Sequence, residues 1–250
     1  GAYAADISTD GTLAVVSGIN NGVNVWRIGE EKPLYHWGHQ GEGNNLVISI
    51  HIAADNSYAV TADREAFALW SLETGEPEGF WRIDEASIRD VAVTNNGEGI
   101  LVARSNGKVM FFEPRTQRRL EFLGHQEKVN SIDISPNGKY ALTGGNDYIA
   151  YLWSTDTGQI IHSFTHPTRV SKVALDDSGR FAFTADSQNK SQIWNVQTGE
   201  PVSTLRYFAR QRIFTDAEFS KDGKYLLTGS PSRQVYLWNV EDGSQEENWQ

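Results

Sequence analysis

His125 and Asp147 are the two side chains of this sequence whose types best suit acid–base chemistry. A carboxylate can orient an imidazole that transfers a proton. Thr143 and Trp153 lie in the same stretch, and these four residue types also suit a hydrogen-bonded structural cluster. The chain has no nucleophile elbow, phosphate-binding loop, dinucleotide fingerprint or HExxH motif. The sequence therefore predicts no catalytic residue, no resident metal and no cofactor.

A repeated pattern must position these residues. A turn residue recurs at intervals of 45, 41, 41, 41 and 44 residues, and a Trp or Phe follows it by fifteen residues in five of the six copies. A period near 40 predicts a closed ring of small sheets. Short strands between regular turn signals indicate antiparallel sheets. We expect one all-β domain, a six-bladed β-propeller with four strands in each blade. The approximate blades are 2–37, 46–83, 88–123, 129–165, 170–207 and 214–250.

At these residues the chain resembles the WD-repeat β-propeller family. A repeat of that family carries a Gly-His pair, a Ser or Thr on the second strand, an Asp in the next turn and a Trp ending the third strand. The resemblance implies that these four side chains form a hydrogen-bonded tetrad. The fourth copy matches the tetrad completely with His125, Thr143, Asp147 and Trp153.

The other copies depart from the family pattern. The fifth copy has Gln188 at the position expected for the Asp, although its His166, Thr184 and Trp194 match. In the second copy the turn is one residue shorter. We therefore expect a degenerate member of the family, with one complete tetrad.

Polar residues also recur on the predicted inner strands, which line the central channel of a propeller. Residues two apart face the same side of a strand. We expect a polar, water-filled channel, with a bound cation or small ligand as the alternative. His36 and His39 predict no metal site, because residues three apart face opposite sides of a strand. The channel candidates are Asp6, His51, Asp90, Asp133, Lys172, Asp216 and Glu218.

The predicted loops divide the charge between two faces of the ring. Turns between the first and second strands, and between the third and fourth, carry most of the acidic residues, whereas basic residues recur on the opposite face. The family resemblance implies that this second, narrow face docks partner peptides. Arg can bind carboxylates bidentately, so we expect an acidic or polar partner segment there. The candidates are Arg64, Arg89, Arg104, Lys128, Arg169, Arg210 and Arg233.

Composition narrows the possible classes of function. The net charge of −10 and the absence of a basic run oppose a nucleic-acid role. The sequence contains no apolar stretch of 18 residues, so no transmembrane helix is expected. The absence of Cys excludes disulfides and thiolate chemistry. The absence of Cys, the single Met and the start of the first predicted strand one residue after Gly1 favour a bacterial source and a periplasmic or envelope location, with the cytoplasm as the alternative. The oligomeric state stays open.

These patterns favour a non-enzymatic scaffold for protein–protein contact. The alternative is a propeller enzyme or a small-ligand or cation binder that uses the central channel. A third possibility is a subunit of a larger assembly. Exposed apolar patches on the outer strands around Trp37 and Trp81 would favour that possibility.

Overall fold

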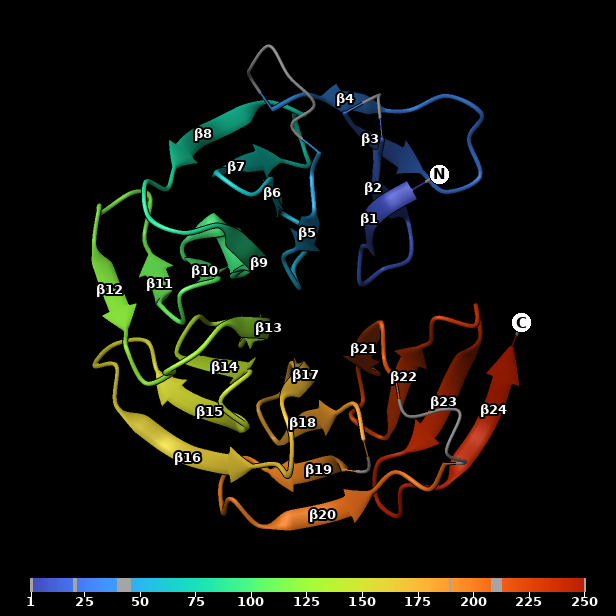
Figure 1. Ribbon diagram of the computed structural model, residues 1–250. Helices are drawn as coiled ribbons and strands as arrows, with labels where there is room; N and C mark the ends of the chain where they lie inside the picture. The colour runs from blue at the N-terminus through green and yellow to red at the C-terminus, as the bar shows by residue number, and fades with distance from the viewer. Residues whose placement is uncertain (1, 20–21, 40–45, 189, 208–212, 250) are drawn as a thin grey trace.

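Six four-stranded antiparallel sheets form the computed structural model of this protein (Figure 1). The structure describes residues 2–19, 22–39, 46–188, 190–207 and 213–249. Within each sheet the strands follow chain order, so every blade is built from its own four strands, as predicted.

The strands of the first three blades lie within residues 2–122, and those of the last three within residues 129–249. Blade 1 contains β1 (Ala2–Ile7), β2 (Leu13–Gly18), β3 (Val23–Arg27) and β4 (Tyr35–Trp37). Blade 2 contains β5 (Ser49–Ile52), β6 (Tyr58–Ala62), β7 (Ala66–Ser71) and β8 (Pro77–Arg82). Blade 3 contains β9 (Ile88–Val93), β10 (Ile100–Arg104), β11 (Val109–Phe112) and β12 (Arg119–Phe122), with the short 3₁₀ turn η1 (Asn95–Gly97). Blade 4 contains β13 (Val129–Ile134), β14 (Tyr140–Gly145), β15 (Ile149–Ser154) and β16 (Ile160–Thr165). Blade 5 contains β17 (Val170–Leu175), β18 (Phe181–Asp186), β19 (Ser191–Asn195) and β20 (Pro201–Thr204). Blade 6 contains β21 (Asp216–Phe219), β22 (Tyr225–Gly229), β23 (Val235–Asn239) and β24 (Gln245–Trp249).

The turn between β13 and β14 shows how the sequence sets the first hairpin of a blade. Gly138 has φ of 74°, which a residue without Cβ adopts freely. The side-chain oxygen of Asn137 accepts hydrogen bonds from the Ser135 hydroxyl at 2.8 Å and from the Lys139 amide at 3.0 Å. This local closure fixes the register that pairs Asp133 with Leu142.

The hydrophobic core lies between the blades. The buried residues of the described chain fall into five clusters, and each cluster joins two consecutive blades. Trp153 is fully buried and stacks on Phe122 of the preceding blade, with ring centroids 4.5 Å apart. Burying one such side chain stabilises the fold by roughly 1.5–3 kcal/mol. Packing between blades therefore contributes to the stability of the fold.

Trp37 and Trp81 do not form the exposed patches that were expected of an assembly subunit. Trp37 is 3% exposed and stacks on Trp70 at 4.8 Å between centroids. Trp81 is half-buried against Phe67 and Phe112. Both tryptophans contribute to contacts within and between blades.

The ring is open between blades 1 and 6, which differs from the closed ring predicted by the repeat (Figure 1). Each inner strand from β1 to β21 packs beside the next, but the described residues of β21 and β1 make no comparable contact. No hydrophobic cluster of the described residues joins blade 6 to blade 1. A sequence period counts the blades but does not set the angle between them.

Candidate functional site

The tetrad of blade 4 is a continuous chain of hydrogen bonds. His125 Nδ1 lies 3.0 Å from an Asp147 carboxylate oxygen, and Nε2 lies 2.8 Å from Thr143 Oγ1. The Trp153 indole donates to the same hydroxyl oxygen at 3.3 Å. If Nδ1–H donates to the carboxylate, Nε2 must accept from the threonine hydroxyl. Each ring nitrogen is thereby engaged within the blade, which leaves neither for substrate chemistry.

Blades 2 and 5 contain two further tetrads. His39 contacts Asp63 at 2.9 Å and Thr61 at 2.7 Å, and Trp70 donates to Thr61 at 2.8 Å. This set completes a blade whose shortened turn had suggested a departure from the pattern.

In blade 5 the aspartate of the tetrad is Asp186, so the assignment of Gln188 to that position is wrong. His166 contacts Asp186 at 3.0 Å and Thr184 at 2.8 Å. Asp63 and Asp186 lie two residues after their threonine, whereas Asp147 lies four after its threonine. A carboxylate reaches the imidazole from the end of the second strand as well as from the turn. An Asp two residues after the Thr was the available sequence signal.

The carboxylates of two tetrads have lowered pKa values, and the pKa of one tetrad imidazole is lowered as well. Burial acts to raise the pKa of Asp147, but the hydrogen bond and charge of His125, together with the backbone amides of Gln126 and Ile149, outweigh it and the pKa is lowered. Asp63 behaves in the same way beside His39. Burial is the main cause that lowers the pKa of His166. The tetrads therefore hold their blades together rather than exchanging protons.

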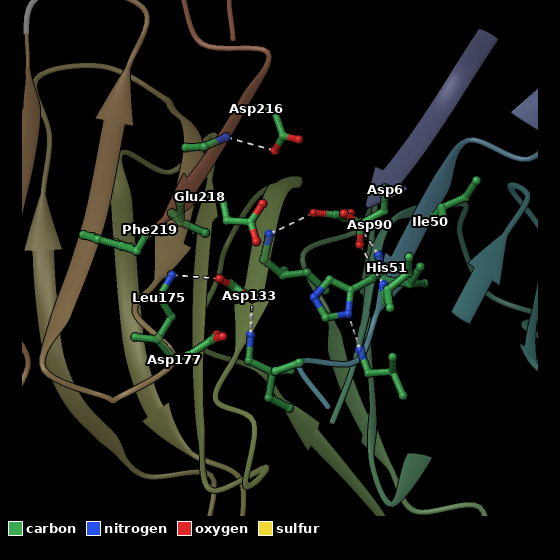
Figure 2. Close-up of a pocket in the computed structure, with 18 of the residues that line it drawn as sticks. Asp6, Ile50, His51, Asp90, Asp133, Leu175, Asp177, Asp216, Glu218 and Phe219 are labelled. Carbon is green, nitrogen blue, oxygen red and sulfur yellow. Dashed lines mark hydrogen bonds between the residues drawn. The ribbon is translucent and has the colours of Figure 1, made fainter. Parts of the chain in front are cut away.

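The inner strands of all six blades surround a cavity of about 140 Å³ (Figure 2). Every channel candidate from the sequence lines this cavity: Asp6, His51, Asp90, Asp133, Lys172, Asp216 and Glu218. The structure thus brings together the charged positions of the inner strands. Within the described chain, no three His, Cys, Asp or Glu side chains converge closely enough to hold a metal ion.

Most of these channel side chains bind the backbone of the next blade. Asp6 accepts the Ile52 amide at 2.7 Å, and His51 Nδ1 accepts the Val93 amide at 2.9 Å. Two more contacts of this kind run from the Ile132 amide to Asp90 at 3.1 Å and from the Leu175 amide to Asp133 at 2.7 Å. We call each such contact an inter-blade clasp. Clasps give the polar inner strands a structural purpose that sequence reasoning missed.

An aspartate binds its own strand where the preceding blade offers no acceptor. In blade 3 the residue that faces the Ile134 amide is Ala92, whose side chain has no acceptor. The Ile134 amide instead donates to its neighbour Asp133 at 2.8 Å. In blade 5 the residue at the acceptor position for the Ala217 amide is Lys172, whose side chain can only donate. The Ala217 amide instead donates to its neighbour Asp216 at 2.9 Å. The Ile134 and Ala217 amides are therefore bound by side chains of their own strands.

Burial and nearby negative charges raise the pKa values of three channel carboxyl groups, those of Asp6, Asp133 and Glu218. Burial raises the pKa of Asp133 to about 8 and of Asp6 to about 7, against the opposing backbone hydrogen bonds. Desolvation, with the neighbouring charges of Asp6 and Asp216, raises the pKa of Glu218 to about 7. Burial acts to lower the pKa of Lys172, but the carboxylates of Asp216, at 3.1 Å, and Asp90 raise it.

Two of the docking candidates, Arg104 and Arg210, cannot be placed on an exposed basic surface of the described residues. Arg104 is 5% exposed and its guanidinium pairs with Glu121 of β12, so it is wrong as a docking residue. Its position at the end of β10 turns it toward the outer strand of its own blade. Arg210 lies outside the described residues. The remaining candidates Arg64, Arg89, Arg169 and Arg233 are exposed, and Lys128 is half-buried.

Arg89, Lys128 and Arg169 form a basic cluster where the chain enters the inner strands of blades 3, 4 and 5. Desolvation lowers the pKa of Lys128, and the positive charges of Arg89 and Arg169 lower it further. None of the three side chains forms an ion pair with a described residue. Three neighbouring cations thus remain available to an incoming anion.

Basic residues in the turns of the opposite face are bound locally. Arg118 pairs with Glu113 at 3.0 Å and donates to the Thr155 carbonyl at 2.7 Å. Arg180 donates to the Asp222 carbonyl at 2.6 Å, and Arg115 to the Asn96 carbonyl at 2.7 Å. These cations connect neighbouring turns, which distinguishes them from the basic cluster.

Comparisons with known proteins find the same repeat. The model of the WD domain, G-beta repeat, matches residues 116–154 and 199–239. Polyadenylation factor subunit 2 of Cryptococcus neoformans is 28% identical over 92 residues, which is 37% of this chain and 13% of that protein. Pre-mRNA-processing factor 19 of Caenorhabditis elegans is 25% identical over 159 residues, 61% of this chain and 31% of that protein. Eukaryotic translation initiation factor 3 subunit I of Meyerozyma guilliermondii is 31% identical over 78 residues, 31% of this chain and 22% of that protein.

The matched stretch spans less than a third of each of these relatives. Their organisms are eukaryotes, so the comparisons do not support the expected bacterial source. Within the described ranges, no helix has the length and apolar character needed to cross a membrane. The chain thus contains WD repeats in the matched stretches, and its six four-stranded blades with their hydrogen-bonded tetrads are arranged as a β-propeller.

Proposed function

We propose that this protein is a non-enzymatic scaffold that docks an acidic segment of a partner protein on its narrow face. The observation that carries the proposal is the basic cluster, whose three side chains come from consecutive blades and lack an acidic partner among the described residues. Arg and Lys at close spacing can bind successive carboxylates of an extended segment. The relatives named above include factors and a subunit, which agrees with a role in protein assemblies.

The alternative use of the central channel has less support. The cavity of about 140 Å³ is smaller than ordinary small-molecule pockets, which measure about 300–1,000 Å³. Four of its polar side chains already accept hydrogen bonds from the adjacent blade. We therefore assign the channel to structure and the narrow face to binding.

Charge reversal of the basic cluster tests this proposal. The double variant Arg89→Glu, Arg169→Glu should bind a fluorescent Asp- and Glu-rich peptide at least tenfold more weakly than wild type, because two attractive charges become repulsive. The measurement is fluorescence anisotropy at two salt concentrations, since screening should reduce wild-type binding.

The matched control is Lys139→Glu, Lys221→Glu, which makes the same change in net charge on the opposite face. Equal weakening by the control would show that net charge alone governs binding, and unchanged binding by the first variant would refute the docking surface. A single-stranded RNA of equal charge serves as a second probe. If the RNA bound more tightly than the acidic peptide, a nucleic acid would replace an acidic protein segment as the proposed partner.

A further inference from the structure

The turn between β14 and β15 in blade 4 places a tyrosine in a backbone conformation that suits glycine. Tyr148 has φ of 71°, in the left-handed region that a bulky side chain rarely adopts. It stands five residues before Trp153, and the residue five before Phe112 in blade 3 is Gly107, with φ of 88°. Glycine adopts this conformation without steric cost. The tyrosine therefore makes folding of the turn less favourable than a glycine would.

The surrounding structure holds this turn in place from two sides. The Tyr148 carbonyl accepts the His166 amide at 2.8 Å. The Asn146 amide donates to the Lys128 carbonyl, also at 2.8 Å. Such fixed neighbours allow a strained conformation to persist. Both contacts are made by the backbone, so neither requires a tyrosine side chain at this position.

The Tyr148 side chain has no polar or aromatic partner among the described residues. It is 50% exposed, and within the described chain no hydrogen bond reaches its hydroxyl and no aromatic ring or cation lies against its ring. The strained φ is thus not offset by a hydrogen bond or ring contact of this side chain. Strain that the fold itself does not use points to a role for the side chain at the surface.

Tyr148 lies on the narrow face between the basic cluster and another exposed apolar residue. Lys128 directly precedes β13, the strand at the channel, and Leu123 directly follows β12, the strand at the rim of blade 3 (Figure 1). Tyr148 directly precedes β15, which is two strands outward from β13 in blade 4. Leu123 is 62% exposed. Positive charge therefore lies toward the channel, and exposed apolar side chains lie toward the rim.

We propose that Tyr148 is a specificity-determining residue of the narrow face, which binds an apolar side chain adjacent to the acidic residues of the docked segment. This inference rests on the proposed function, because the basic cluster supplies the attraction for the acidic residues. The exposed ring offers apolar surface, and covering it with a partner side chain adds affinity without charge. Any acidic segment can satisfy the cluster, so the apolar contact is what separates one such segment from another.

Two fluorescent peptides test the inference. Both carry the same run of Asp and Glu, which is flanked on both sides by Leu in one peptide and by Ser in the other. Wild type should bind the Leu-flanked peptide about tenfold more tightly in fluorescence anisotropy, because an aromatic contact of this kind is a typical hot spot. Tyr148→Gly should bind both peptides as weakly as wild type binds the Ser-flanked one. Tyr148→Phe should keep the preference, because the hydroxyl has no partner among the described residues.

The unfolding temperature supplies a readout that a structural role would move in the opposite direction. Tyr148→Gly should unfold about 2–4 °C above wild type, because glycine relieves the strained φ. The matched control is Gln117→Gly. Gln117 has φ of 62°, is exposed, and lies in the turn between β11 and β12 on the opposite face. This control should also raise the unfolding temperature, and it should leave the peptide preference unchanged.

Three results would overturn the inference. Wild type could bind the two peptides equally, or the preference for Leu could survive in Tyr148→Gly. A lower unfolding temperature in Tyr148→Gly would also count against it, because the ring would then belong to the fold. A single-stranded RNA that loses more affinity than the Leu-flanked peptide in Tyr148→Gly would replace the protein segment as the occupant, since bases also stack on exposed aromatic rings.

The double variant Arg89→Glu, Arg169→Glu separates this inference from the proposed function. It should weaken both peptides at least tenfold and leave their ratio in favour of Leu. If wild type bound both peptides equally and this variant weakened both, the proposed function would stand and the role of Tyr148 would be wrong. If wild type bound neither peptide, both proposals would be wrong.

Discussion

The tetrads and the inter-blade clasps both bury carboxyl groups, yet they shift the pKa in opposite directions. The pKa of Asp147 is lowered because His125 and two backbone amides together overcome the effect of burial. The pKa of Asp133 is raised to about 8 because two backbone amides do not overcome burial and the nearby Asp177 and Glu218. The two carboxyl groups each accept backbone amides, so the difference lies in the imidazole beside Asp147 and in the deeper burial and acidic neighbours of Asp133.

This difference also separates two kinds of mechanical role. A tetrad connects strands of a single blade, as His125, Thr143 and Trp153 do in blade 4. A clasp connects the inner strands of two blades, as Asp133 does with Leu175. Tetrads should therefore govern the stability of a blade, and clasps the cohesion of the ring around its channel.

Removing a tetrad imidazole should have the largest effect of the changes considered. His125→Ala leaves the Asp147 carboxylate and the Thr143 hydroxyl buried without their main partner, which should cost about 3 kcal/mol of unfolding free energy. Urea unfolding followed by tryptophan fluorescence and circular dichroism measures the loss.

His36→Ala is the matched control, since His36 is exposed and its ring hydrogen-bonds Asn24 on the neighbouring strand of its own blade. It should change the unfolding free energy by less than about 0.5 kcal/mol. Equal losses of unfolding free energy in the two variants would mean that the hydrogen bonds of the tetrad do not stabilise the blade. The proposed difference in role between tetrads and clasps would then be wrong.

The sequence predicted the architecture well because its signals are local and repeated. Turn glycines and third-strand tryptophans fix strand order within each blade, and His125 with Asp147 matches one family repeat. Blade 5 was misjudged because an aspartate can reach the imidazole from two positions, and only the fold shows that Asp186 does so. Arg104 was misjudged because the direction of a side chain at a strand end depends on the neighbouring strand.

The clasps and the opening could not be predicted from the sequence for a different reason. They depend on how one blade is placed beside the next, over a separation of about 40 residues. Asp6 was recognised as polar and facing the channel, but its bond to the Ile52 amide requires the offset between two inner strands. The exposure of Leu227 requires the position of blade 1 relative to blade 6.

The two carboxyl groups should respond to pH in opposite ways, which sharpens the comparison. Between about pH 4 and 8 the folded protein holds a proton on Asp133 that the unfolded chain has lost, so stability falls as pH rises, by at most about 1.4 kcal/mol per pH unit from this group. Asp147, with a lowered pKa, contributes stability above the unfolded pKa of 3.8, and this stability is lost as pH falls.

The variants Asp133→Asn and Asp147→Asn isolate these contributions. Asp133→Asn should be less stable than wild type by about 1 kcal/mol at pH 5, because its amide nitrogen cannot accept a backbone hydrogen bond. That deficit should shrink toward pH 8. The deficit of Asp147→Asn should instead shrink as the solution becomes acidic. Urea titrations from pH 3.5 to 8.5 measure both, and parallel profiles for the two variants would contradict the opposite pKa shifts.

The smallest expected effect concerns Lys172, the lysine of the channel. Its ammonium lies 3.1 Å from Asp216, a residue whose side chain is 74% exposed, so the pair should contribute less than about 1 kcal/mol. Lys172→Met should nevertheless raise the pKa of both Asp6 and His51, because the positive charge of Lys172 lowers each of them. Titrations followed by NMR at the Asp6 carboxyl carbon and the His51 ring measure the two shifts, with Lys108→Met outside the channel as control. Unmoved pKa values would mean that water in the channel screens the lysine, and burial alone would then set the protonation of the clasps.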